Sequence, residues 1–269
     1  MKIFEEMFGV KQPILGMVHF PPLPGSPLYD SNKGMTYIRD TAKRDVASLL
    51  EAGFDGIVFS NEGDRPYLSN VEKVTVAAMS SVIKEATIGI NVPFGLSVLA
   101  DPEAAIAIGT AVESDFVRIF LSWVYVGDWG IVDPCAGKLQ RVKTNNFGKM
   151  KIFANISGHT EPLGGRSLED IARGAVKFGL ADAVCLAGTT AGSEIEESDL
   201  HDARKGAEGV PVIAGTGVRT ENVERMLSLA DGVIMGTSIK VDKNTFNPID
   251  PERAKEFIRK AREAREKNA

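Results

Sequence analysis

Short apolar runs alternate along this chain with longer segments of helical periodicity. Eight of the runs have the length and composition of buried strands, and they cover residues 14–19, 56–61, 94–99, 116–120, 151–156, 183–187, 212–214 and 232–235. Strands that alternate with helices indicate parallel βαβ units. Eight such units in 269 residues predict an α/β fold, a single (β/α)8 TIM barrel that occupies residues 1–269 as one domain.

Helix start signals support this count. Asp-Pro-Glu occurs at 101–103 and again at 250–252, and each gives an N-cap, an N1 proline and an acid in the first turn. Residues 167–170 resemble a capping box, and Thr220 is expected to cap a helix over 221–227. The last helix, from 251 to about 267, should carry i,i+4 pairs between residues 256 and 260 and between 263 and 267.

Glycines and hydroxyl residues end the last two predicted strands. Gly215 and Gly217 follow the run at 212–214, and Gly236, Thr237 and Ser238 follow the run at 232–235. Glycine lets backbone N–H groups approach an anion, and the loops after strands 7 and 8 of a TIM barrel are its usual phosphate site. The alternative is that these glycines only make tight turns. Two such turns in tandem favour phosphate binding.

Two connections are unusually rich in informative residues. The loop at 20–27 holds four prolines and cannot become a helix. The connection over 121–149 contains both tryptophans, Trp123 and Trp129, and loops of this length are uncommon unless they are functional or disordered. An ordered lid and an oligomer contact are equally good interpretations of it, and we expect a homo-oligomer.

Composition narrows the classes of function. The net charge of −5 and the absence of a basic stripe argue against nucleic acid as a partner. No run is long enough for a membrane span, and the acidic N-terminus is not a signal peptide. Two cysteines, Cys135 and Cys185, are too few for a disulfide framework, so we expect a cytoplasmic protein.

Candidate catalytic groups lie at the ends of predicted strands, where barrel enzymes place them. His19 shares a strand face with residues 15 and 17, and it is either an acid/base group or an anchor for the proline loop. Glu62 is either catalytic or a solvated charge. Arg118, inside an apolar strand, should meet a substrate anion or a carboxylate such as Glu62. Asn155 completes the set at the end of the run at 151–156.

Metal and cofactor chemistry have weaker signals, and the cofactor stays unknown. His19, His159 and Glu62 or Asp64 could bind a divalent metal, although they lack the close spacing of known zinc motifs. There is no P-loop, and the strand at 183–187 carries a cysteine and no lysine, which disfavours Schiff-base chemistry. We expect Cys185 in the core, residue 201 on the surface, and residues 188–193 as either a turn or a source of ligand donors.

Several of these segments resemble the BtpA/SgcQ family. The matching motifs are Gly-Met-Val-His-Phe-Pro-Pro-Leu-Pro-Gly-Ser-Pro at 16–27, Glu-Gly-Asp-Arg-Pro at 62–66, and the glycine segments around 215–223 and 230–238. The resemblance extends over nearly the whole chain and implies a TIM barrel of the phosphate-binding kind. The region 128–133 is more similar to the SgcQ-like branch. Residues 96–101 and 155–159 depart from the BtpA-like pattern, which has Arg-Asn-Asp and Asp-Val-His there.

The resemblance implies different roles for different branches of the family. One branch is linked to photosystem I accumulation. Another occurs together with sugar phosphotransferase genes, and its members are loosely described as nucleoside triphosphatases. From the residues themselves, we expect an enzyme that acts on a small phosphorylated metabolite, of the sugar-phosphate isomerase, epimerase or lyase type. The alternatives are a non-catalytic assembly or stability factor and a nucleotide-hydrolysing enzyme.

Overall fold

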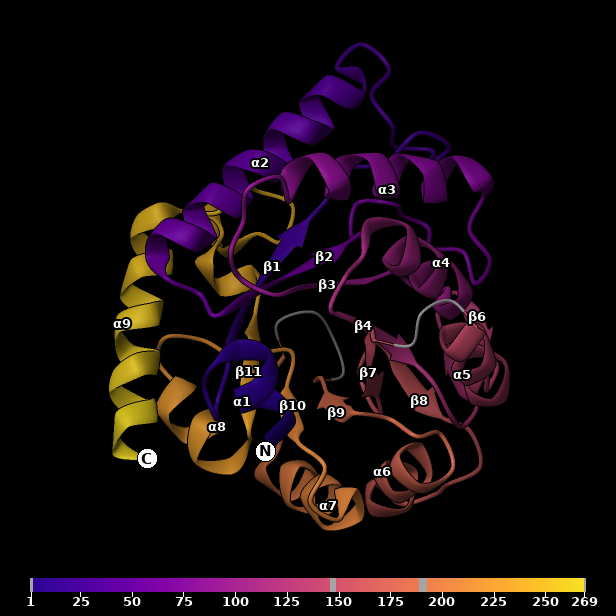
Figure 1. The fold of residues 1–269 in the computed structure, drawn as a ribbon, viewed down its shortest axis with the longest axis vertical. Coiled ribbons are helices and arrows are strands. Elements are labelled where there is room, and N and C mark those ends of the chain that lie inside the picture. Colours follow the sequence, from indigo (N-terminus) through magenta and orange to yellow (C-terminus); the bar gives the residue numbers. More distant parts are fainter. Residues whose placement is uncertain (1, 146–148, 189–192, 269) are drawn as a thin grey trace.

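Eight parallel strands close into a barrel in the computed structural model, which describes residues 2–145, 149–188 and 193–268 (Figure 1). Around the barrel the strands follow the order β1-β11-β10-β9-β7-β4-β3-β2. Their bounds are β1 (Ile14–His19), β2 (Gly56–Ser60), β3 (Phe94–Ser97), β4 (Phe116–Phe120), β7 (Lys151–Asn155), β9 (Ala183–Leu186), β10 (Val212–Ala214) and β11 (Gly232–Met235). The predicted (β/α)8 barrel is confirmed, and four strands end one or two residues earlier than expected.

Helices surround the barrel and cover its outer face (Figure 1). In chain order they are α2 (Gly34–Ala52), α3 (Lys73–Ala86), α4 (Pro102–Val112), α5 (Ala136–Asn145), α6 (Leu168–Lys177), α7 (Glu197–Ala207), α8 (Val223–Leu229) and α9 (Pro251–Lys267). Two short 3-10 turns, η1 (Thr237–Ile239) and η2 (Val241–Lys243), lie between β11 and α9. The apolar helix faces pack on the outward-facing strand residues to form the larger of two hydrophobic clusters.

A smaller cluster fills the inside of the barrel. Its strand residues are Leu15, Met17, Val58, Phe116, Phe153, Ala183, Cys185, Ile213 and Ile234. Helix α1 (Lys2–Phe8) closes the N-terminal end, where Phe4 packs edge-on against Phe153 with ring centroids 5.9 Å apart. Cys185 is fully buried, as predicted. The opposite end, where the strands terminate, is left for polar residues.

The long connection after β4 has its own secondary structure. It contains β5 (Tyr125–Gly127), β6 (Gly130–Val132) and then α5. β5 pairs on its other side with β8 (Thr160–Pro162), which belongs to the connection after β7. We call these three antiparallel strands the mouth sheet. The described residues of this connection, 121–145 and 149, thus include regular secondary structure, and both interpretations of it, a lid and an oligomer contact, stay predictions.

Helix ends test the capping predictions. Asp101 accepts a hydrogen bond from the N–H of residue 104, Asp250 from those of 252 and 253, and Ser167 from that of 170, as the motifs predict. The cap at Thr220 is wrong, because α8 begins after Asn222. Asn222 instead ties the preceding turn together: it accepts from Arg219 N at 2.7 Å and donates to Gly217 O at 3.0 Å.

The expected ion pairs along α9 are also wrong. Lys267 pairs with Glu224 on α8 at 2.7 Å, and Glu263 pairs with Arg259 at the same distance. For Lys267 a partner on a neighbouring helix thus replaces the local one, whereas Glu263 pairs with a different residue of the same helix. Within the described ranges, no helix combines the length and the apolar character needed to traverse a bilayer.

Candidate active site

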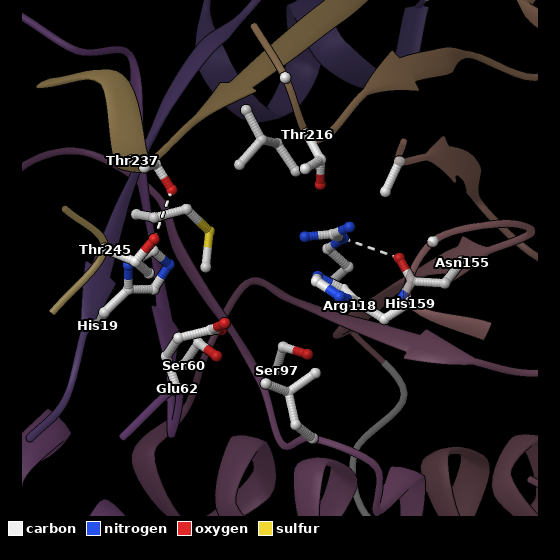
Figure 2. A pocket seen from close by; sticks show the side chains of 18 of the residues that line it. His19, Ser60, Glu62, Ser97, Arg118, Asn155, His159, Thr216, Thr237 and Thr245 are labelled. Atoms are coloured by element: carbon white, nitrogen blue, oxygen red, sulfur yellow. Dashed lines mark hydrogen bonds between the residues drawn. The ribbon is translucent and has the colours of Figure 1, made fainter. Parts of the chain in front are cut away.

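A pocket of about 340 Å³ lies at the C-terminal ends of the barrel strands. This is the end at which barrel enzymes carry their active sites, and the volume suits a small ligand. All nine residues predicted for the site line it: His19, Glu62, Arg118, Asn155, Gly215, Gly217, Gly236, Thr237 and Ser238. Figure 2 labels His19, Glu62, Arg118, Asn155 and Thr237 among them. The nine come from β1, β4, β7 and the loops after β2, β10 and β11, so the fold brings residues that are up to 219 positions apart, from 19 to 238, into one place.

His19 ends β1 and stands beside the turn at Gly236. A Cβ on Gly236 would lie 3.0 Å from His19 Cε1, so a larger residue there would press against the imidazole. Burial, together with the nearby charges of Lys240 and Arg118, lowers the pKa of His19 to about 3, although the backbone of Thr245 favours the protonated ring. The imidazole is therefore neutral near pH 7, and it can donate or accept a hydrogen bond without carrying charge.

Glu62 follows β2 and projects into the same pocket. Burial raises the pKa of its carboxyl above the ordinary value, while Arg118 and the hydroxyls of Tyr67 and Ser60 act in the opposite direction. The Tyr67 hydroxyl donates to the Glu62 main-chain oxygen at 3.1 Å and approaches its carboxylate at 3.5 Å. A carboxyl with a raised pKa in a cleft is the usual form of a general acid or base near neutral pH.

Arg118 reaches into the pocket from β4 (Figure 2). Its Nε donates to Asn155 Oδ1 at 2.7 Å, and a Cβ on Gly215 would lie 3.1 Å from its terminal nitrogen. The ion pairs of the described residues include none between Arg118 and Glu62, so the suggested pair is wrong, although the charge of Arg118 still acts on the pKa of Glu62. Asn155 orients the guanidinium along one edge, and Arg118 lines the pocket.

The loops after β10 and β11 form two glycine turns, residues 215–217 and 236–238. Gly217 has φ +75°, and a side chain there would overlap the carbonyl oxygen of Ser193. The Thr237 hydroxyl is hydrogen-bonded to that of Thr245 at 2.8 Å. Two cations, Arg219 and Lys243, also line the pocket at these loops. The site therefore combines close backbone approach, hydroxyls and positive charge, which is the chemistry that holds an anion.

The metal hypothesis is not supported by the geometry. In the portion of the chain that is described, no three His, Cys, Asp or Glu side chains come together as a metal site. Asp64 has a different role: its Oδ1 accepts from Leu23 N at 2.7 Å and fixes the proline loop. His159 does line the pocket, and burial lowers its pKa. His201 is exposed on α7, as predicted.

Other residues of the site were missed by sequence reasoning. Ser60 and Ser97 point inward at the ends of β2 and β3, and Trp129 reaches the pocket from the mouth sheet. Ser60 faces the pocket because it is two residues after the interior residue Val58, but the sequence of this strand has no alternation that could have shown this. The donors predicted at 189–192 lie outside the described residues.

A parallel (β/α)8 barrel with a polar pocket at its C-terminal mouth is the architecture of many enzymes. The sequence profile of the BtpA family matches residues 10–263, and the chain belongs to that family. It is 34% identical over 267 residues to the putative sgc region protein SgcQ of Escherichia coli K12, which covers 98% of this chain and 100% of that protein. It is 31% identical over 257 residues to the Photosystem I biogenesis protein BtpA of Synechocystis, with coverage of 94% and 89%.

A solved structure shares the fold at low identity. The (S)-3-O-geranylgeranylglyceryl phosphate synthase of Thermoplasma acidophilum, in complex with its substrate sn-glycerol-1-phosphate, superposes with a TM-score of 0.59. The sequences are 15% identical, and the match covers 97% of this chain and 98% of that one. This likeness supports the barrel architecture.

Proposed function

We propose that this protein is an enzyme that binds a small phosphorylated metabolite, of the sugar-phosphate class, and isomerises, epimerises or cleaves it. The proposal is supported above all by one observation: Glu62, Arg118 and the two glycine turns line the same pocket. The turns and the cations suit a phosphate, and the carboxyl with its raised pKa suits proton transfer.

Phosphate is the ligand group that fits the glycine turns best. They occupy the positions after the seventh and eighth barrel strands, β10 and β11, where phosphate sites of this fold commonly lie. Arg118, Arg219 and Lys243 line the pocket of a chain whose net charge is −5. Arg219 pairs with Glu194 at 2.7 Å and Lys243 with Glu221 at 3.9 Å, so Arg118 is the one of the three without an ion pair among the described residues. The structurally similar synthase binds a glycerol phosphate, which agrees with this assignment.

The shared step of the three reactions is removal of a proton from a carbon next to a carbonyl group. Glu62 takes the proton, the electron pair of the C–H bond forms a C=C double bond, and the π pair of the carbonyl group moves to its oxygen to give an enediolate. Arg118 and the neutral His19 donate hydrogen bonds to that oxygen. Return of the proton to the other carbon, with transfer of the hydroxyl proton between the two oxygens, completes an isomerisation. Return to the opposite face of the same carbon gives an epimerisation, and expulsion of a leaving group with its bonding electron pair from the next carbon gives a lyase reaction.

A second candidate is an assembly factor without catalysis. One relative carries the name Photosystem I biogenesis protein and aligns with 94% of this chain. If this role applies, Glu62→Gln is silent in cells, whereas substitutions on the exposed mouth sheet are not. If the enzymatic role applies, Glu62→Gln abolishes turnover.

Binding can be tested by a thermal-shift screen with inorganic phosphate, sugar phosphates, nucleotides and their dephosphorylated analogues, with and without divalent metal. A ligand at 100 times its Kd adds about 2.7 kcal/mol of stability. This should raise the unfolding midpoint by several degrees, at roughly 2–4 °C per kcal/mol for a chain of this size. A panel without any phosphate-dependent shift would refute the proposal.

Catalysis can be tested without knowledge of the product. Each compound that binds is incubated with the protein in D₂O, and exchange of the hydrogen next to its carbonyl group is followed by NMR. We expect exchange with the parent protein and none with Glu62→Gln, which should still bind the same compound. Binding without exchange in the parent would favour the assembly factor.

A further inference from the structure

Trp129 occupies a fixed position above the pocket. It lies with Asp128 on a two-residue turn, because Gly127 and Gly130 pair across β5 and β6. Gly127 also pairs with Thr160 of β8, so the turn is held from both sides. At the other end of β5 the fully buried Tyr125 anchors the mouth sheet to the barrel. The mouth sheet therefore presents this indole to the pocket on a rigid support.

The orientation of the indole determines which of its atoms a ligand can reach. Trp129 lines the pocket, yet its Nε1 is shielded from solvent and has no hydrogen-bond partner among the described residues. The ring packs nearly perpendicular to Tyr67, with centroids 5.5 Å apart, and its centroid lies 6.4 Å from that of His159. Because Nε1 is shielded from solvent, the indole surface that a ligand in the pocket can reach is carbon.

This carbon surface lies across the barrel from the glycine turns. β4, which leads into the mouth sheet, is four strands away from β11 in either direction around the closed barrel. Figure 2 shows Thr237 and His159 on opposite sides of the pocket, with Arg118 on the side of His159. A phosphate at the glycine turns would therefore lie on the opposite side of the barrel mouth from Trp129. A ligand that contacts both has to extend from the glycine turns towards β4.

We propose that Trp129 and His159 form a distal subsite that packs against the carbon skeleton of the ligand. This inference rests on the proposed function, and it specifies the substrate as a phosphorylated sugar whose C–H face reaches the aromatic rings. Apolar C–H surface gains by leaving water for an aromatic carbon surface, and the hydroxyls of the sugar remain free for Ser60 and Ser97. Inorganic phosphate would fill the glycine turns and leave this subsite empty.

Affinities of ribose 5-phosphate, fructose 6-phosphate and inorganic phosphate for the Trp129→Ala and Trp129→Phe variants test the subsite. We expect Trp129→Ala to weaken sugar phosphate binding by roughly twofold to twelvefold, the range of 0.5–1.5 kcal/mol for an aromatic contact. Trp129→Phe should lose less, and inorganic phosphate should bind all variants equally. Trp123→Ala is the matched control. Trp123 lies just before β5 of the mouth sheet and donates to Leu163 O, but it is not among the residues that line the pocket.

Fluorescence provides a direct readout. In a Trp123→Phe background Trp129 is the single tryptophan, because the chain has two. We expect its emission to change with a sugar phosphate and to stay constant with inorganic phosphate. Unchanged affinity of Trp129→Ala for the sugar phosphates would overturn the subsite while the proposed function stands. An equal loss of affinity for all three compounds, inorganic phosphate included, would overturn it in the same way. If none of the three binds the parent protein, the proposed function fails, and the subsite fails with it.

Discussion

The ammonium group of Lys240 donates a 2.7 Å hydrogen bond to Asp45 Oδ2, and both side chains are 1% exposed. The other carboxylate oxygen of Asp45 accepts from Ile249 N at 3.2 Å. One carboxylate on α2 thus holds both ends of the loop from 240 to 249. That loop carries Lys243 and Thr245, which line the pocket, so the ion pair connects the outer helix layer to the site.

Replacement of Asp45 should therefore be strongly destabilising. Asp45→Asn leaves the buried ammonium of Lys240 without a countercharge, and loss of one partner from such a pair lowers the free energy of unfolding by about 3–5 kcal/mol. Urea denaturation measures this loss. Glu113→Gln is the control, because it breaks the exposed pair with Lys84 and should change the stability little. Equal effects of the two substitutions would contradict the prediction.

The same variant should have a distinct pH dependence. Burial lowers the pKa of Lys240 below 10.5, and Asp45 opposes that shift, so the pKa falls further in Asp45→Asn. Between the lowered folded value and 10.5 the unfolded chain binds more protons than the folded one. Stability then rises with pH in this window. The loss in free energy of unfolding caused by Asp45→Asn should therefore become smaller from pH 7 to pH 10. A loss that stays constant over this range would show that Lys240 stays charged.

Glu62→Gln should stabilise the protein at neutral pH. Burial raises the pKa of Glu62, so above pH 4.5 the folded state retains a proton that the unfolded chain has lost. The stability of the parent therefore falls as the pH rises through the folded pKa. The thermal unfolding midpoint of the variant should exceed that of the parent by an amount that grows between pH 4 and pH 8. The difference is expected to be roughly 2–4 °C for each kcal/mol by which the substitution raises the free energy of unfolding. The exposed Glu5→Gln should show no such trend.

The fold could be predicted because its signals are local. Each barrel strand is a short apolar run between turn residues, and Asp101 and Asp250 cap helices through motifs of three residues. The prediction that Thr220 caps α8 was wrong, because tertiary contacts determine where that helix begins. Thr220 and Asn222 are both good caps by type, and the contacts of Asn222 with the turn at Gly217 decide between them.

Sequence reasoning found residues that line the pocket where strand ends alone determine position, and it did not find them where a strand is buried on both faces. All five residues of β2 are buried, so no alternation shows that Ser60 and not Asn61 faces the pocket. Asp64 looked equivalent to Glu62 by type, but its partner Leu23 lies 41 residues away. Trp129 reaches the pocket through pairing of β5 with β8, which no sequence pattern in either segment indicates.

Gly217→Ala should disturb the glycine turn more than its φ angle alone explains. Gly217 and Gly209 both have positive φ, +75° and +94°, but only at Gly217 would a Cβ meet other atoms, those of Ser193 and Glu194. A left-handed alanine costs about 1–2 kcal/mol at either position. We expect the free energy of unfolding of Gly209→Ala to fall by that amount, and its affinity for phosphate to equal that of the parent. Gly217→Ala should lose more stability and most of its phosphate affinity, and equal behaviour of the two would count against the turn as a phosphate site.

Asn155→Asp should weaken anion binding without unfolding the protein. The substitution keeps the shape of the side chain and places a negative charge at the oxygen that accepts from Arg118 Nε at 2.7 Å. A charge-assisted bond forms, and it offsets the positive charge that Arg118 presents to the pocket. We expect affinity for inorganic phosphate to fall about tenfold, equivalent to 1.4 kcal/mol, with an unfolding midpoint no lower than that of the parent. Isothermal titration calorimetry measures the affinity. Asn32→Asp adds the same charge on an exposed loop and should bind phosphate like the parent, so equal losses in the two variants would place the anion away from Arg118.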